Sequence, residues 1–364
     1  GITGSTGKTS TKELIAGVLA EKYRVLKTEG NFNNEIGVPL TLLRIRRETE
    51  AAVVEMGISD FGEMHRLSKM VRPNICVITN IGQSHLKDLK SRDGILKAKS
   101  EIFDFLAEDG EICLNCEDDK LITLEEVKGH RPHFFGLGGN PAQEVIAEDI
   151  QSQGLWGSDV LMRMPGCEEG FRVHIPLPGR HMVLNAAAAV CTAQRLGLPP
   201  QQITAGLSKL SPVSGRGDLL RLPWCTVIDD CYNANPASME AALELLSLAD
   251  TEKTAILGDM FNLGENSTEY HEQVGRYAAQ AGIDRILCVG EESGHMFRGA
   301  CSHGQEKGQV WHFPTLEALL EALQKEPDAY VPQGCTVLVK ASHGMEFTRV
   351  TEALKAMPPD CSYM

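Results

Sequence analysis

The chain of 364 residues lacks several features that would each indicate a particular class of protein. No apolar run approaches the ~20 residues that a bilayer-spanning helix needs, so membrane insertion is not expected. The formal net charge of −14 argues against a nucleic-acid-binding protein, which would carry a basic face. The N-terminus has neither a basic segment nor an apolar signal core, so a cytoplasmic location is expected.

Paired cysteine spacing is also scarce, although the chain contains 11 cysteines. Scattered thiols are typical of a reducing compartment rather than of a disulfide framework. Cys113 and Cys116 form a C-x-x-C that is followed by His130 and His133. The gap between these histidines is shorter than zinc sites use, and Cys113 lies in an apolar run that predicts a buried strand. We therefore interpret this group as structural rather than metal-binding.

What the sequence does contain is an alternation of strand-like apolar runs and helix-like segments, over a length that favours two domains. In the first part, strands are expected at 51–56, 74–81, 111–114 and 171–175, and helices at 8–22, 63–70, 91–106 and 181–196. In the second part, strands are expected at 226–229, 254–257, 285–289 and 336–339, and helices at 239–248, 269–280, 316–323 and 345–355. A linker-like composition at 211–217 separates the two parts.

The strongest motif is the glycine-rich run Gly1-Ile2-Thr3-Gly4-Ser5-Thr6-Gly7-Lys8-Thr9. Glycines let backbone amides converge on phosphate oxygens, and the helix that follows adds its positive N-terminal end. Lys8 is then expected to reach the β- and γ-phosphates of ATP, and the Thr9 hydroxyl to ligate Mg²⁺. A turn that merely caps a helix would not need Gly-Lys-Thr at the helix start. Because such a loop normally follows a buried strand, we expect that a segment is missing before Gly1.

The positions of the three glycines resemble those of the Mur ligases and folylpolyglutamate synthases. Five further blocks resemble the Mur ligases in particular, namely residues 30–39, 229–236, 257–260, 263–265 and 340–345. In detail the blocks are most similar to those of the members that join D-alanyl-D-alanine to UDP-MurNAc-tripeptide. The resemblance implies an ATP- and Mg²⁺-dependent, monomeric ligase of peptidoglycan precursor synthesis that forms an amide through an acyl phosphate.

The fold implied is α/β, with an ATP-binding domain over 1–210 and a smaller, doubly wound Rossmann-like domain over 211–364. The first domain is expected to have a mainly parallel sheet. In the family, a separate N-terminal domain holds the UDP-sugar end of the substrate, and we expect it to be absent here.

The resemblance also assigns roles to individual residues. The implied magnesium ligands are Thr9, Glu55, His85 and Lys99, the last as a carbamate, and the implied catalytic residues are Lys8, Lys99, His85 and Arg216. The implied nucleotide contacts are Gly4, Ser5, Thr6, Gly7, Lys8, Thr9, Asn31, Asn34, His181, Asn185, Arg216 and Asp230. The implied dipeptide contacts are Asn233, Asn235, Lys340, Ser342 and His343. Met182, Phe261, Asn262 and His343 differ from the usual family residues.

Several alternatives remain open at the level of the sequence. A histidine such as His85 is more often a surface residue, and Lys99 could be a solvated helix lysine like Lys97, because periodicity does not separate the two. The whole chain could be a ligase for another amine, as in the folylpolyglutamate synthases. It could also be a non-catalytic nucleotide-binding module.

Overall fold

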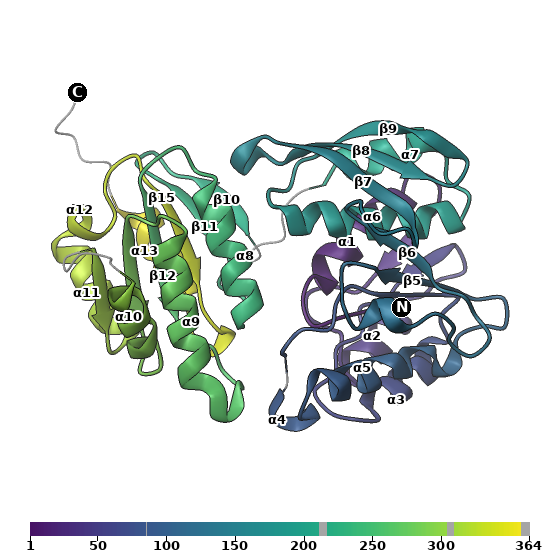
Figure 1. Ribbon diagram of the computed structural model, residues 1–364, viewed down its shortest axis with the longest axis horizontal. Helices are drawn as coiled ribbons and strands as arrows, with labels where there is room; N and C mark the ends of the chain where they lie inside the picture. The colour runs from purple at the N-terminus through teal and green to yellow at the C-terminus, as the bar shows by residue number, and fades with distance from the viewer. Residues whose placement is uncertain (85, 211–216, 304–308, 358–364) are drawn as a thin grey trace. The chain divides into compact units, whose positions relative to one another are not determined.

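The computed structural model describes residues 1–84, 86–210, 217–303 and 309–357, and the chain forms two compact units, Gly1–Ser211 and Pro212–Met364 (Figure 1). The predicted linker at 211–217 therefore lies almost entirely outside the described residues. No helix in the described ranges combines the length and apolar character needed to cross a bilayer.

The first unit is built on a seven-stranded sheet in the order β1-β4-β5-β6-β7-β8-β9. Its strands are β1 (Ile2–Thr3), β4 (Ile75–Ile78), β5 (Glu111–Asn115), β6 (His133–Gly136), β7 (Gln143–Ser152), β8 (Ser158–Met164) and β9 (Cys167–Ile175). Pairing is parallel from β1 to β7 and antiparallel from β7 to β9. The mainly parallel sheet is thus confirmed, and of its antiparallel edge only β9 was expected.

A shorter parallel pair, β2 (Val25–Lys27) and β3 (Ala51–Val53), lies beside β1, because Glu55 just beyond β3 bridges Ile2. The helices of the unit are α1 (Lys8–Leu19), α2 (Gly37–Leu42), α3 (Glu63–Val71), α4 (Leu86–Leu89), α5 (Arg92–Ser100), α6 (Arg180–Arg195) and α7 (Pro200–Ser208). Short 3₁₀ turns cover Glu101–Phe105, Leu121–Thr123 and Gly154–Trp156.

Helices cover both faces of this sheet, as alternating side chains of one strand show. Val77 of β4 packs into a core with α1, α6 and α7, whereas its neighbours Cys76 and Ile78 pack into a second core with α3 and α5. Successive residues of a strand point to opposite faces, so one apolar strand serves both cores. The helix α6 packs against α1 (Figure 1), and its central alanines, such as Ala186, are fully buried.

The helix expected at 91–106 is shorter than predicted, because α5 ends at Ser100 and continues as a 3₁₀ turn. The reason is a side chain from another helix. Ser68 of α3 donates its hydroxyl to Ile102 O at 2.7 Å and accepts from Phe105 N at 3.2 Å. Both groups are thereby bonded outside the α-helical ladder, which no local pattern in 91–106 reveals.

The second unit has a six-stranded sheet in the order β10-β11-β15-β12-β13-β14. Its strands are β10 (Asp218–Arg221), β11 (Thr226–Asp229), β12 (Lys253–Gly258), β13 (Arg285–Val289), β14 (Val310–Phe313) and β15 (Thr336–Lys340). Only β10 is antiparallel to its neighbour. The four predicted strands are confirmed, while β10 and β14 were not expected.

The helices of this unit are α8 (Pro236–Ser247), α9 (Ser267–Gln280), α10 (Ser293–Ser302), α11 (Leu316–Lys325), α12 (Pro327–Tyr330) and α13 (Thr348–Ala356), with 3₁₀ turns at Gly264–Asn266 and His343–Met345. The helix expected at 345–355 begins only at Thr348, because Glu346 adopts a left-handed φ of 55° that interrupts any helix.

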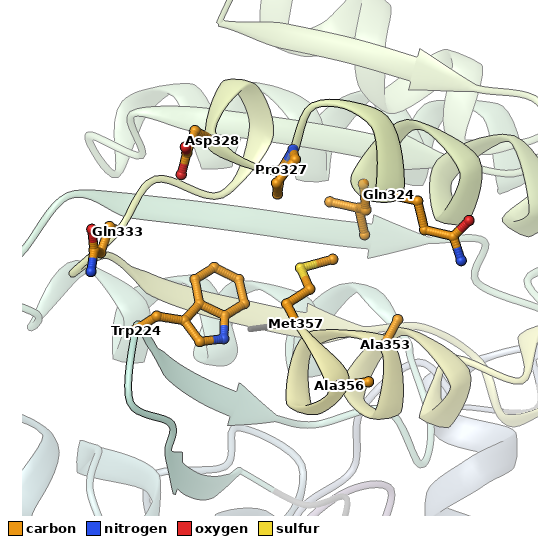
Figure 2. A pocket seen from close by; sticks show the side chains of 9 residues that line it. Trp224, Gln324, Pro327, Asp328, Gln333, Ala353, Ala356 and Met357 are labelled. Atoms are coloured by element: carbon orange, nitrogen blue, oxygen red, sulfur yellow. The ribbon is translucent and has the colours of Figure 1, made fainter. Parts of the chain in front are cut away.

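A cavity of about 400 Å³ lies in the second unit beside α11, α12 and α13, as Figure 2 shows. It is lined by Trp224, Leu323, Gln324, Pro327, Asp328, Gln333, Ala353, Ala356 and Met357. The Trp224 indole N–H donates to Leu354 O at 3.2 Å. Trp224 and Gln333 precede β11 and β15, so the cavity borders the amino ends of these strands.

Candidate functional site

The phosphate loop connects β1 to α1, and its glycines are required by close neighbours. A Cβ on Gly4 would lie 1.9 Å from Thr79 Oγ1, and one on Gly7 would lie 2.9 Å from Asn185 Oδ1. Gly7 also has a left-handed φ of 77°, which side chains disfavour. The loop backbone therefore passes close to the end of β4 and to α6, and this places Asn185, a predicted nucleotide contact, beside it.

Two side chains hold the loop in shape. The Lys8 ammonium donates to Gly4 O at 2.8 Å, so the lysine curls over the loop. Asn80, which follows β4, accepts from Thr6 N at 3.0 Å and donates to Thr6 Oγ1 at 2.8 Å. No role for Asn80 was predicted from the sequence, although its place near the end of a predicted strand was a usable signal.

A buried carboxylate lies directly beneath the start of α1. Glu55 is 1% exposed; its Oε2 accepts from the Thr9 hydroxyl at 2.8 Å, and its Oε1 accepts from Asn33 Nδ2 at 2.8 Å. Thr9 and Glu55, which are 46 residues apart, are two of the predicted magnesium ligands. A hydroxyl and a carboxylate are hard oxygen donors of the kind that Mg²⁺ prefers, so these residues fit that ion.

Asn33, for which no role was predicted, contacts this carboxylate, while Asn31 and Asn34 were predicted as nucleotide contacts. Asn31 is exposed, and Asn34 Oδ1 accepts from the amides of Ile36 and Gly37 at 3.1 and 2.9 Å at the start of α2. The sequence does not distinguish three asparagines that lie within four residues. Only the backbone path of the loop decides which of them reaches the Glu55 carboxylate.

Lys99 lies on α5 and is only 2% exposed, whereas Lys97 two residues earlier is exposed. The alternative of a solvated helix lysine is therefore wrong. Burial, assisted by the charge of Lys8, lowers the pKa of Lys99 well below its ordinary value. Such a lysine has a nucleophilic, neutral amine at much lower pH than a solvated one.

Two further predicted nucleotide contacts, both on α6, differ in their exposure to solvent. Asn185 is 8% exposed on α6, while His181, one turn earlier, is exposed. His85 and Arg216, which were predicted as catalytic, lie outside the described residues.

In the second unit, a buried lysine joins two predicted residues at the carboxyl edge of the sheet. Lys340, at the end of β15, is 2% exposed, and its ammonium donates to Asp230 Oδ2 and to Asn233 O, the latter at 3.0 Å. Asp230 directly follows the neighbouring strand β11. The side chain of Asn235, by contrast, accepts from Ser238 N at 3.0 Å and caps α8.

Ser342 and His343 follow β15 at the same edge. The Ser342 hydroxyl accepts from Phe261 N at 2.9 Å, and Ser342 N donates to Asp259 O at 3.1 Å. The exposed His343 ring lies 5.4 Å from the ring of Tyr232, centroid to centroid. Ser342 therefore ties the loop after β12 to the loop after β15.

A buried histidine of α9, which was not predicted from the sequence, also holds the loop after β12 by a hydrogen bond. His271 Nε2 accepts from Met260 N at 3.0 Å, and its Nδ1 lies 2.7 Å from Ser267 O, which can only accept. These contacts define the neutral tautomer with a proton on Nδ1. Asp259 accepts from the amide and the hydroxyl of Ser293 at 2.7 and 2.6 Å. The place of His271 in the predicted helix at 269–280 was only a weak signal for this role.

A phosphate loop with a buried acid beneath it, followed by a doubly wound unit with polar residues at its carboxyl edge, is the arrangement of an ATP-dependent ligase. Residues 2–193 match the Mur ligase middle domain, and residues 215–343 match the Mur ligase, glutamate ligase domain. The chain therefore belongs to the Mur ligase family.

Within that family, the chain is similar to ligases that act on D-alanyl-D-alanine. It is 37% identical to the UDP-N-acetylmuramoyl-tripeptide–D-alanyl-D-alanine ligase of Bacillus subtilis over 98% of this chain and 76% of that protein. The crystal structure of MurF from Acinetobacter baumannii superposes with a TM-score of 0.89 at 34% identity, over 98% of this chain and 76% of that one. MurF of Thermotoga maritima, solved in complex with ADP, superposes with a TM-score of 0.83 at 27% identity, over 97% and 78%.

Proposed function

We propose that this chain joins D-alanyl-D-alanine to UDP-N-acetylmuramoyl-tripeptide, with cleavage of ATP, in peptidoglycan precursor synthesis. The observation that carries the proposal is the 37% identity, along 98% of the chain, to a ligase of that name. The contacts of the phosphate loop support the ATP-dependent half of the reaction. In the reaction proposed, the terminal carboxylate of the tripeptide takes the γ-phosphoryl group, and the dipeptide amine then displaces phosphate from the acyl phosphate to form the amide.

In the first unit, Gly4, Ser5, Thr6 and Gly7 would surround the phosphates with backbone amides. Lys8 would leave Gly4 O for the transferring phosphoryl group, where its charge offsets negative charge in the transition state. Asn31, Asn34, His181, Asn185 and Arg216 are retained as proposed nucleotide contacts.

Thr9 and Glu55 would hold Mg²⁺ together with His85 and Lys99. The ion, when bound, supplies charge neutralisation to the phosphate oxygens. Glu55 is ready for this role because Thr9 and Asn33 orient both of its carboxylate oxygens. If the hydrogen bond from the Thr9 hydroxyl to Glu55 breaks, one oxygen of each residue becomes free to face the cation.

Lys99 is proposed to carry a carbamate. Its neutral amine would add to the carbon of CO₂, forming an N–C bond and releasing one proton to solvent. The product replaces a buried, neutral amine by an anion close to Lys8. The lowered pKa supports this step, because only the unprotonated amine has the electron pair that attacks CO₂.

In the second unit, Asp230 is proposed to contact the nucleotide, and Asn233, Asn235, Lys340, Ser342 and His343 the dipeptide. The Lys340 ammonium is bonded to Asp230, so a substrate carboxylate would share or exchange that bond. We further propose that 1–210 and 211–364 are the ATP-binding and amine-binding domains and that the working enzyme is a cytoplasmic monomer.

The test is a turnover assay in which ADP release is measured over a panel of amines and UDP-peptides. We expect ATP cleavage to require UDP-MurNAc-tripeptide and D-alanyl-D-alanine together. Preference for a single amino acid such as glutamate would favour another ligase of the family or of the folylpolyglutamate type. Nucleotide binding without cleavage under any combination would favour a non-catalytic module.

A further inference from the structure

A second lysine is buried beneath the phosphate loop, and the proposed reaction does not use it. Lys12 lies one turn after Thr9 on α1 and is 1% exposed. Its Nζ donates to Thr28 O at 2.8 Å and lies 2.9 Å from Glu13 Oε1 and 3.9 Å from Glu55 Oε2. A lysine is almost never fully buried without a partner, so these contacts account for its position.

Thr28 connects Lys12 to the same glutamate through the main chain. The Thr28 hydroxyl accepts from Glu55 N at 3.0 Å, while Thr28 N donates to Val53 O at 3.1 Å. Lys12, Thr28 and Glu55 therefore form a closed set of contacts. Lys12 holds the Thr28 carbonyl, Thr28 holds the Glu55 amide, and the Lys12 ammonium faces the Glu55 carboxylate.

The charges around Lys12 alternate in sign from the interior to the surface. Glu55 comes first, with its side chain 1% exposed, followed by Lys12 at 2%, Glu13 at 22% and Lys27 at 46%. Glu13 also pairs with Lys27. A carboxylate as deeply buried as Glu55 is costly unless a nearby charge balances it, because desolvation of an isolated ion exceeds what hydrogen bonds return.

We infer that Lys12 is a positioning residue that acts through Glu55, balancing its buried charge while no divalent cation is present. The inference rests on the proposed function, in which Glu55 holds Mg²⁺. When the cation binds, Glu55 gains a second positive neighbour, and Glu13 keeps Lys12 paired. Lys12 thus stabilises the metal-free site and competes with the metal for the same carboxylate.

The experiment combines Lys12→Met with Glu55→Gln, as single and double variants, in the whole chain. Met keeps the length of the side chain without its charge. In metal-free buffer, Lys12→Met should lower the thermal midpoint of the first unit by roughly 5–15 °C, because it leaves an unbalanced buried carboxylate. In the Glu55→Gln background the same substitution should cost much less. Equal losses in both backgrounds would overturn the inference.

The second readout is the rise in midpoint on adding saturating Mg²⁺. It should be larger for Lys12→Met than for the wild type, because the metal then replaces the missing counter-charge. Where Mg²⁺ stabilises the wild type, a merely structural lysine would leave this rise unchanged in the variant, and that result would overturn the inference. Lys27→Met, at the exposed end of the same charge series, is the matched control and should alter neither readout.

Two further outcomes are informative. If Lys12→Met does not fold, recovery of folding in the double variant with Glu55→Gln demonstrates the same coupling, and its failure to recover contradicts it. If the wild type gains no stability from Mg²⁺ while the coupling of Lys12 and Glu55 persists, the inference stands and the metal role in the proposed function is wrong.

Discussion

At the scale of single residues, Lys8 is the group whose loss should affect chemistry most and folding least. Its ammonium contacts Gly4 O at 2.8 Å on a half-buried loop, so the core does not depend on it. Lys8→Ala should reduce ligation by at least about 100-fold, since it removes a charge from the transferring phosphoryl group. Turnover and circular dichroism measure the two effects. A variant that keeps a tenth of wild-type turnover would contradict the assigned role.

Lys99 and Lys97 form a natural pair at the same scale, because they differ in burial within one helix. Lys99→Ala should be inactive, and short carboxylates such as formate or acetate should partly restore turnover by standing in for the carbamate. Lys97→Ala should retain full activity. Since burial lowers the pKa of Lys99, its neutral amine is available to CO₂ at lower pH than that of a solvated lysine, and removal of CO₂ should lower turnover. Insensitivity of turnover to CO₂ would argue against the carbamate.

At the scale of elements, His271 links α9 to the loop after β12, and its protonation should loosen that link. Burial lowers its pKa below the ordinary value, although Asp259 and Glu292 act in the opposite direction. The unfolded state therefore binds a proton at a higher pH than the folded state does. The stability from neutral His271 is complete above its ordinary pKa of about 6.5 and is lost as pH falls through the lower, folded value.

His271→Gln should make this loss shallower, because glutamine can still accept from Met260 N but does not titrate. The measurement is the urea midpoint of the second unit between roughly pH 5 and 7. His303→Gln, at an exposed position after α10, serves as the control and should keep the wild-type pH profile. A pH profile for His271→Gln that is parallel to the wild type would show that another group controls acid stability.

At the scale of the whole molecule, one exposed apolar face bears on the proposed monomer. Ile36 and Leu43, at either end of α2, are 74% and 75% exposed, and Leu40 between them is 48% exposed. The spacing places the three on one side of the helix. Exposed apolar patches promote association, so we expect a monomer at low concentration and reversible association at high concentration. Light scattering of the Ile36→Ser/Leu43→Ser variant should show weaker association. A dimer that persists on dilution would exclude the monomer.

Local sequence was sufficient for the elements and for the phosphate loop. Residues 226–229 and 285–289 were predicted as strands with the bounds that the structure has, because each is a short apolar run between turn residues. The segment from 136 to 179 was harder, since its glycines and prolines obscure the antiparallel strands β7 and β8. The residues around 101–105 were wrong because Ser68, from a distant helix, decides their hydrogen bonding.

The sequence by itself determined that a glycine-rich loop opens a helix, that parallel strands alternate with helices, and which family the motifs resemble. Only the tertiary structure decided that Glu55 meets Thr9, that Lys99 is buried while Lys97 is not, and that Lys340 pairs with Asp230. The physical reason is that periodicity records which face a residue takes within its own element. Burial and charge pairing depend on strand order, which joins residues as far apart as 110 positions.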